Sequence, residues 1–259
     1  MPAQLLSTSH GATLVLTLHN PELRNALEPE MYAAGIEALN VAERSAEVRS
    51  VVITGSGGAF CSGGNLRSMR THRLAPAETH VESIEGLHNW IETIRAYPKP
   101  VIAAVEGPAA GAGFSLALCC DMIVAARNAS FLMAYSNVAL SPDGGATWSL
   151  TRALPRALVT ELLMCGNRID AERLHGLGLI NRLSNAGSAL DDALALAEQL
   201  NARAPNALAS IKELLTEADG NNLNTQLRLE RDHFVRNLLH ANAGEGIAAF
   251  LDKRTARYT

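Results

Sequence analysis

The sequence predicts an α/β fold, in which a layer of strands is covered by helices. Two apolar runs rich in β-branched residues, at 51–55 and 101–105, each lead into a glycine-rich turn, and a segment of helical pattern lies between them. The turns occupy residues 60–65 and 107–113. This repeated order of strand, turn and helix is typical of α/β proteins.

The composition is that of a globular protein. Of the 259 residues, 47% are apolar and 19% are charged, which is enough apolar material for a sizeable core. The net charge is −4 and no dense run of Lys and Arg is present, which argues against a nucleic-acid partner. Residues 1–10 lack the pattern of a signal peptide, and no apolar stretch is long enough to span a membrane. We therefore expect a cytoplasmic protein without a membrane partner.

The first elements are a strand, a loop and a helix. Alternating apolar residues predict a strand at 12–18, which the loop at 20–25 interrupts. Apolar side chains near helical spacing predict a helix over 29–46, followed by a strand at 48–54. The polar stretch at 68–80 is a candidate mobile segment.

The middle of the chain repeats this order. A helix is predicted over 78–97, and the Pro-Lys-Pro sequence at 98–100 ends it. After the second glycine-rich turn, the pattern predicts a helix at 111–120 and short strands at 121–126 and 130–133.

Beyond residue 150 the strand signals fade and helices dominate. The segment 188–259 has the pattern of consecutive amphipathic helices, which cannot bury both faces alone and are expected to pack on the core and on other subunits. We divide the chain into a core of residues 1–195 and a helical oligomerisation region of residues 196–259.

The cysteines and acidic residues predict neither a disulfide framework nor a metal site. Cys61, Cys119, Cys120 and Cys165 have no C-x-x-C spacing, and two of them are adjacent. Buried free thiols are the simpler interpretation. No cluster of His, Asp and Glu has the spacing of metal ligands.

The glycine-rich turns do not match a phosphate-binding loop. The second turn lacks the third glycine of G-x-G-x-x-G, and neither turn has the Gly-Lys-Ser/Thr that ends a Walker A loop. Two such turns at the ends of successive strands can aim free N–H groups at one negatively charged oxygen. The alternative is that the glycines only permit tight packing.

Several motifs recur in an order that resembles a known family. The chain is similar to the crotonase (enoyl-CoA hydratase/isomerase) superfamily from about residue 14 to its C-terminal helix, in the segments 20–27, 53–66, 98–113 and 120–121. The resemblance implies a ClpP-like spiral of ββα turns with a C-terminal helical trimerisation region. It also implies an acyl-CoA thioester substrate, no cofactor beyond the coenzyme A of the substrate, no metal, and a homotrimer or dimer of trimers.

The resemblance places an oxyanion hole at the N–H groups of Gly64 and Ala112. Ala112 lies at an expected helix N-terminus, where free N–H groups and the helix dipole favour negative charge. The two glutamates that hold water in hydratases fall at Ser115 and Tyr135, so neither position carries a carboxylate. A role in the pocket wall and a role in chemistry both stay open for these two residues.

Because Ser115 and Tyr135 carry no carboxylate, Asp143 is the acidic residue expected near the site. From the residues alone, it is either an N-cap for a helix that begins near Gly145 or a catalytic group. The resemblance favours catalysis, because family members that shift double bonds carry an acid at this position. Segments 107–148 and 225–254 most resemble the ring-opening 1,2-epoxyphenylacetyl-CoA isomerases of phenylacetate degradation, which also lack both hydratase glutamates.

We therefore predict an acyl-CoA isomerase in which Asp143 transfers a proton, either to shift a double bond or to open an aromatic epoxide thioester. One alternative is an enoyl-CoA hydratase with atypical acid and base groups. Another is a non-catalytic homologue that binds acyl-CoA.

The resemblance also implies residues that bind the substrate. Arg24 and the backbone of Ala26 are expected beside the nucleotide, and Phe250 and Lys253 are expected to reach it from the C-terminal helix of the same or a neighbouring subunit. Lys253 is alternatively an ordinary solvated helix end. Further expected contacts with the substrate are Ser62, Asn65, Leu66, Gly111, Ser115 and Tyr135. Candidates to line the acyl pocket, each of which is alternatively plain core, are Phe114, Met133, Leu140 and Trp148.

Overall fold

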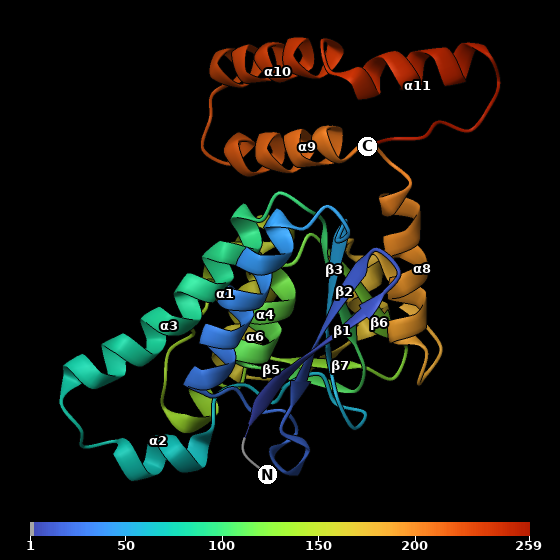
Figure 1. The fold of residues 1–259 in the computed structure, drawn as a ribbon. Helices are drawn as coiled ribbons and strands as arrows, with labels where there is room; N and C mark the ends of the chain where they lie inside the picture. Colours follow the sequence, from blue (N-terminus) through green and yellow to red (C-terminus); the bar gives the residue numbers. More distant parts are fainter. Residues whose placement is uncertain (1–2) are drawn as a thin grey trace.

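The computed structural model describes residues 3–259 and confirms the α/β class (Figure 1). Its strands are β1 (Gln4–His10), β2 (Thr13–His19), β3 (Ser50–Gly55), β4 (Val101–Val105), β5 (Pro108–Ala110), β6 (Met122–Ala126), β7 (Ser130–Leu132), β8 (Arg168–Asp170) and β9 (Arg182–Ser184). Its helices are α1 (Pro29–Arg44), α2 (Leu66–His72), α3 (Ala77–Ala96), α4 (Ala112–Cys119), α5 (Ala146–Ala153), α6 (Arg156–Cys165), α7 (Ala171–Gly176), α8 (Ala189–Asn201), α9 (Pro205–Ala218), α10 (Leu223–Leu238) and α11 (Ala241–Leu251). The 3₁₀ turns are η1 (Pro21–Leu23) and η2 (Ser136–Val138).

A six-stranded sheet of order β1-β2-β3-β4-β6-β9 forms the centre of the fold. All neighbouring strands are parallel except the hairpin of β1 and β2. Strand β4 is apolar throughout and every residue of it is buried, as expected for a parallel strand covered on both faces. Figure 1 shows α8 on one side of this sheet and α1, α3 and α4 on the other.

Alternate residues of the central strands contribute to two separate cores. Val52, Ile102 and Val124 pack with Ala193 and Leu196 of α8. The intervening residues of the same strands join a larger core with α1, α3 and α4. The period of two along each strand therefore fixes which side chains face α8.

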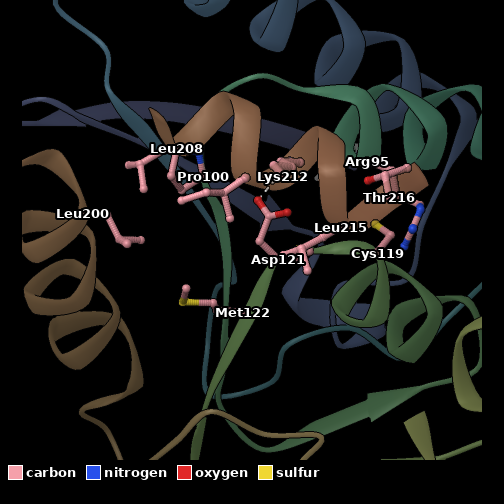
Figure 2. Close-up of a pocket in the computed structure, with 12 residues that line it drawn as sticks. Arg95, Pro100, Cys119, Asp121, Met122, Leu200, Leu208, Lys212, Leu215 and Thr216 are labelled. Carbon is pink, nitrogen blue, oxygen red and sulfur yellow. Dashed lines mark hydrogen bonds and ion pairs between the residues drawn. The ribbon is translucent and has the colours of Figure 1, made fainter. Parts of the chain in front are cut away.

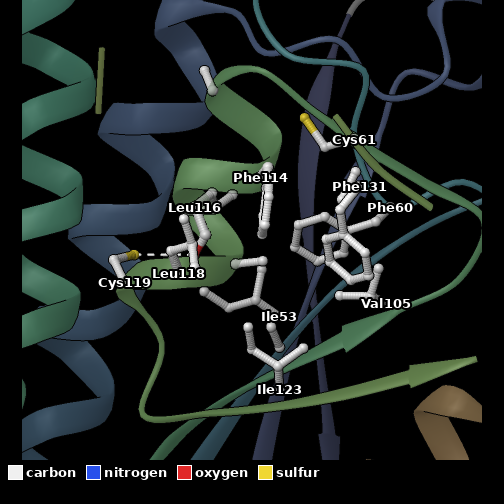
Figure 3. Close-up of a cluster of buried hydrophobic side chains, with 14 of the residues drawn as sticks. Ile53, Phe60, Cys61, Val105, Phe114, Leu116, Leu118, Cys119, Ile123 and Phe131 are labelled. Atoms are coloured by element: carbon white, nitrogen blue, oxygen red, sulfur yellow. Dashed lines mark hydrogen bonds between the residues drawn. The ribbon is translucent and has the colours of Figure 1, made fainter. Parts of the chain in front are cut away.

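A smaller sheet of order β5-β7-β8 lies against α4. Strand β5 ends two residues before Ala112, and it pairs with β7 in parallel. Figure 3 shows Phe114 of α4 beside Phe131 of β7, and their ring centroids are 4.8 Å apart. This contact fixes the N-terminus of α4 on the core.

Several elements differ from the prediction. Most of the stretch 68–80 is helical, because α2 and the start of α3 occupy it and residues 73–76 connect them. Asn65 caps α2 by accepting hydrogen bonds from the N–H groups of Arg67 and Ser68. Helices dominate beyond residue 150 as expected, but the strands β8 and β9 also lie there; each has three residues, too few for a recognisable alternation. Strand β1 was missed because it is polar and mostly exposed at the sheet edge.

Helices α9, α10 and α11 form a layer beyond the sheet (Figure 1). The domain boundary predicted after residue 195 lies inside α8, and it stays a prediction. This helical layer exposes many apolar side chains, among them Ile211, Leu215, Leu223, Leu227, Phe234, Leu238, Leu239, Ile247, Phe250 and Leu251. No helix within residues 3–259 is long and apolar enough to cross a bilayer.

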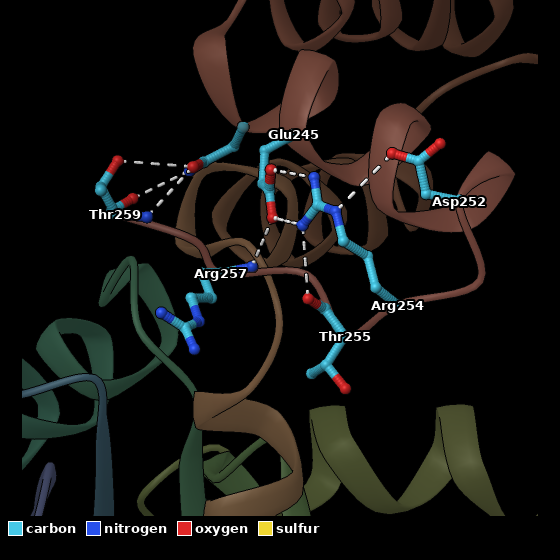
Figure 4. Close-up of polar contacts among 7 residues, drawn as sticks. Glu245, Asp252, Arg254, Thr255, Arg257 and Thr259 are labelled. Carbon is cyan, nitrogen blue, oxygen red and sulfur yellow. Dashed lines mark hydrogen bonds and ion pairs between the residues drawn. The ribbon is translucent and has the colours of Figure 1, made fainter.

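The C-terminal tail folds back along α11 and is held by a polar cluster (Figure 4). Arg254 donates two hydrogen bonds to Glu245, at 2.7 and 2.9 Å, and the Arg257 N–H donates a third. These hydrogen bonds first, and then the charge of Arg254, lower the pKa of Glu245 to about 2. Arg49 donates to the carbonyl oxygens of Tyr258 and Arg203, which ties the tail to the core.

Helix α9 is anchored to the core at a cavity of about 290 Å³ (Figure 2). Lys212 Nζ lies 2.9 Å from Asp121 Oδ2 and also donates to the carbonyl oxygen of Ile94. Burial raises the pKa of Asp121, and the charge of Lys212 opposes that rise. The Lys212 and Asp121 side chains are 13% and 25% exposed, so this ion pair is shielded from water.

We predict that Lys212→Met lowers the free energy of unfolding by about 2 kcal/mol, between the values for an exposed and a fully buried pair. The reason is that the Asp121 carboxylate keeps its burial and loses its cation. Urea unfolding followed by circular dichroism measures the change. The matched control is Arg127→Met, which removes the pair with Glu172 at 2.9 Å, where both side chains are more than half exposed. A loss for Lys212→Met no larger than for this control contradicts the anchor.

Candidate active site

The first glycine-rich turn follows β3 and is fixed by the loop that precedes α1. Asn25 Nδ2 donates at 2.8 Å to the carbonyl oxygens of Ser56 and of Ala59. The Leu27 N–H donates to the carbonyl oxygen of Gly63, and Leu27 forms a bridge with Gly64. These bonds fix the backbone at Gly64, the first expected oxyanion donor.

The second glycine-rich turn packs directly on the first. The Ala110 N–H donates to the carbonyl oxygen of Cys61 at 2.9 Å. Gly63 has φ +91°, and a methyl group on it would lie 2.8 Å from the Ala110 oxygen. A methyl group on Gly113 would lie 2.6 Å from the Cys61 carbonyl oxygen. Glycine is required at both positions because the two backbones touch.

Two N–H groups stay free where the turns meet. Within residues 3–259, neither the Gly64 N–H nor the Ala112 N–H donates a hydrogen bond to the protein. Ala112 is the first residue of α4, so the dipole of this helix adds positive potential at its N–H. The backbone can therefore hold a negatively charged oxygen at this point.

Asp143 lies on the loop between η2 and α5 and is bound by the two hydroxyl residues singled out from the sequence. The Tyr135 hydroxyl donates to Asp143 Oδ1 at 2.5 Å, and Ser115 Oγ donates to the Asp143 carbonyl oxygen at 3.1 Å. The capping alternative for Asp143 is wrong: the N-cap of α5 is Gly145, and no side chain caps that helix.

Tyr135 also connects the acid to the oxyanion turn. A methyl group on Gly111 would lie 3.7 Å from the Tyr135 hydroxyl oxygen, and Gly111 directly precedes Ala112. Burial first, and then the charge of Asp143 and the hydrogen bond to it, raise the pKa of Tyr135 far above its usual value. Tyr135 is therefore a hydrogen-bond donor at neutral pH and not a base.

The expected nucleotide contacts gather beside the first turn. The Ser62 N–H donates to the carbonyl oxygen of Arg24 at 3.0 Å, and Ser62 Oγ donates to that of Leu23. Arg24 is exposed, whereas the backbone N–H and C=O of Ala26 are bonded to Leu23 and Asn20. The expected contacts Asn65 and Leu66 lie at the start of α2.

The remaining expected residues divide between the core and other surfaces. Phe114 and Met133 are core residues, and Leu140 is exposed. The guanidinium groups of Arg95 and Arg152 lie over the ring of Trp148, at 4.3 and 4.0 Å from its centroid.

Phe250 and Lys253 are exposed at the end of α11, and Phe250 is 84% exposed. Figure 1 shows α11 in the helical layer, far from α2, so this chain does not bring them to its own site.

Two residues near the site were missed by the sequence analysis. Met69 Cε lies against Gly64, and its position four residues after Asn65 places it over the turn only once α2 is known. Tyr32 is buried on α1, and burial and the charge of Asp143 raise its pKa. Its place in the apolar pattern of α1 gave no signal beyond a core position.

The cysteines and acidic residues of the described chain do not form a metal site. Cys61 and Cys119 are buried, and burial raises the pKa of Cys61 to about 12. Cys165 is exposed, so the expectation of a buried thiol is wrong there. In the part of the chain that the structure describes, no three His, Cys, Asp or Glu side chains gather as metal ligands do.

Comparison with known proteins identifies the family. The family model described as enoyl-CoA hydratase/isomerase matches residues 8–259. The chain belongs to this family. It is a member of the crotonase superfamily, and the spiral core with a helical C-terminal region is the fold of its relatives.

Relatives in the enoyl-CoA hydratase/isomerase family carry different activity names. The chain is 38% identical to a 1,2-epoxyphenylacetyl-CoA isomerase of Escherichia coli K12, covering 98% of each chain. It is 35% identical to a putative enoyl-CoA hydratase of Thermus thermophilus, covering 98% of this chain and all of that one. A crystal structure of an enoyl-CoA hydratase from Polaromonas sp. JS666 matches with a TM-score of 0.98 and 67% identity, covering 98% of this chain and 99% of that one.

We predict that Ala112→Pro lowers kcat for any acyl-CoA reaction of this family member by about 100- to 1000-fold, the usual loss for one oxyanion donor. Proline removes the N–H and is tolerated at the first position of a helix. Steady-state kinetics and thermal unfolding separate lost chemistry from lost folding. The control is Ala241→Pro, at the first position of α11. An Ala112→Pro enzyme within threefold of wild type rules out this donor.

Proposed function

We propose that the protein is an acyl-CoA isomerase in which Asp143 moves a proton along the acyl chain. The Gly64 and Ala112 N–H groups hold the thioester oxygen during this transfer. The observation that carries the proposal is the carboxylate of Asp143, held by Tyr135 beside the oxyanion turn. The 38% identity to a 1,2-epoxyphenylacetyl-CoA isomerase supports the same assignment.

On a 3-enoyl-CoA, the carboxylate of Asp143 takes a proton from Cα of the acyl chain. The electron pair of that C–H bond delocalises onto the thioester oxygen and forms a dienolate, whose negative charge the two N–H groups stabilise. The same carboxyl group then returns the proton to C4, and the double bond becomes conjugated with the thioester. In an aromatic epoxide thioester, proton transfer by the same group would accompany opening of the ring.

Water addition is the second candidate reaction, because the 67% identical relative is named an enoyl-CoA hydratase. A hydratase needs a base that activates water. Tyr135 stays protonated, and Ser115 Oγ is engaged with the Asp143 carbonyl oxygen. Neither residue is therefore available as the base that activates water, which favours the isomerase over the hydratase. Substantial turnover of crotonyl-CoA to the hydroxyacyl product would reverse that order, and tight acyl-CoA binding without any turnover would indicate a non-catalytic homologue.

We also propose that the exposed apolar side chains of α9, α10 and α11 form contacts between subunits in a trimer or a dimer of trimers. In that assembly, Phe250 and Lys253 would border the nucleotide of a neighbouring subunit. Their exposure at the end of α11, away from this chain's own oxyanion turns, supports an intersubunit role.

We predict that Asp143→Asn lowers kcat for isomerisation of a 3-enoyl-CoA and of the aromatic epoxide thioester by at least about 100-fold. The amide cannot accept the proton, and general base catalysis contributes about 10²–10⁴-fold. Binding of coenzyme A, measured by calorimetry, should not change. Asp191→Asn, an exposed carboxylate on α8, is the control and should keep full activity. Near-wild-type isomerisation by Asp143→Asn on both substrates refutes the mechanism.

We predict that Arg24→Gln raises KM for acyl-CoA about tenfold and leaves kcat unchanged, because one charge-assisted contact to a phosphate is lost. The sharper readout is the ratio of KM values for the same acyl group on coenzyme A and on pantetheine, which lacks the nucleotide. The variant should lose the wild-type preference for coenzyme A. Arg173→Gln, exposed on α7, is the control. An unchanged ratio in Arg24→Gln removes Arg24 from the nucleotide site.

A further inference from the structure

Both positions that carry glutamates in hydratases hold hydroxyl groups in this chain, and both hydroxyls bond to Asp143. Ser115 Oγ donates to its main-chain oxygen at 3.1 Å, and the Ala146 N–H donates to the same oxygen at 3.2 Å. Tyr135 donates to the side-chain oxygen Oδ1 at 2.5 Å. The Ser115 hydroxyl therefore holds the backbone of the loop, and the Tyr135 hydroxyl holds the Asp143 carboxylate.

These contacts leave the two carboxylate oxygens of Asp143 unequal. Oδ1 is occupied by Tyr135, whereas Oδ2 accepts no hydrogen bond from any group in residues 3–259. A carboxylate fixed through one oxygen presents the other in a defined direction, which favours proton transfer at a single point. Tyr135 is itself partly buried against the larger core, and its hydroxyl lies beside Gly111, which restricts its orientation.

We propose that Tyr135 is a positioning residue that holds Asp143 through Oδ1 and leaves Oδ2 as the atom that exchanges the proton with substrate. This inference rests on the proposed function, since it assigns an atom to the base that function requires. It separates the isomerase from a hydratase at one residue: a glutamate at position 135 would repel the Asp143 carboxylate, whereas a tyrosine hydroxyl donates to it.

The other titratable groups around Asp143 do not compete for this task. Tyr32 of α1 and Cys61 of the first turn are the other groups here whose pKa burial raises, so both stay protonated at neutral pH. Glu28 at the start of α1 is bound by the side-chain amide of Asn65. A change in the pH profile on alteration of Tyr135 therefore reports on the hydrogen bond to Asp143.

The test is Tyr135→Phe, which removes the donor and keeps the ring. We expect kcat for isomerisation of a 3-enoyl-CoA to fall about tenfold with KM within twofold, because the carboxylate loses its orientation and not its contact with bound substrate. The acid limb of the kcat profile should move to higher pH, since a hydrogen bond to the charged carboxylate favours that form. Tyr97→Phe is the matched control, because the Tyr97 hydroxyl is buried and has no partner within residues 3–259.

A second variant should shift the acid limb of the kcat profile in the opposite direction. It keeps both the ring and the hydroxyl, so a loss of packing cannot explain the shift. With 3-fluorotyrosine at position 135 the hydroxyl is more acidic and donates more strongly, so the acid limb should move to lower pH. An unchanged acid limb in both variants overturns the inference, and so does a rise in KM with unchanged kcat.

Asp143→Asn distinguishes this failure from failure of the proposed function. If Asp143→Asn is inactive while Tyr135→Phe behaves as wild type, only the positioning role is wrong. If Asp143→Asn stays active, the proposed function itself is wrong.

Discussion

The site depends on the direct contact between two glycine-rich turns. Gly63 leaves no room for a side chain against Ala110, and Gly113 leaves none against Cys61. Because backbone meets backbone, the N–H groups of Gly64 and Ala112 are fixed relative to each other by the fold itself. Phe114, packed on Phe131 in the core, holds the helix that carries the second donor. The acid and base groups around these N–H groups can therefore change without loss of the proposed oxyanion hole.

In our proposal, the residues around the oxyanion hole determine which reaction takes place there. Relatives that match nearly the whole chain are named both hydratases and isomerases, so membership of the family does not select between these reactions. In this chain the two hydroxyls at positions 115 and 135 both act on Asp143. The proposed site thus has one carboxylate, that of Asp143, and hydroxyls at both positions where a hydratase is expected to carry glutamates, which accords with the proposed transfer of a proton along one substrate.

The sequence predicted the parts of this arrangement that depend on local patterns. The strands that lead into the turns have a clear apolar run, and the turns have the glycines that their contact requires. The three-residue strands β5, β8 and β9 escaped prediction because they pair only through the tertiary fold. The hydrogen bond from Tyr135 to Asp143 was not predicted either, because it depends on the side-chain orientations of two loop residues in the tertiary structure. For the same reason Phe114 proved to be core, and no local pattern could show that Gly145 caps α5 in place of Asp143.

The central claim is that Asp143 removes a proton next to a thioester whose oxygen is held by the backbone. Nuclear magnetic resonance of phenylacetyl-CoA in D₂O tests it directly, because exchange of the α-hydrogens needs the base and the oxyanion hole but no net reaction. The account predicts exchange with the wild-type enzyme well above the rate without enzyme, and none above that rate with Asp143→Asn. Equal exchange by the two proteins would contradict it.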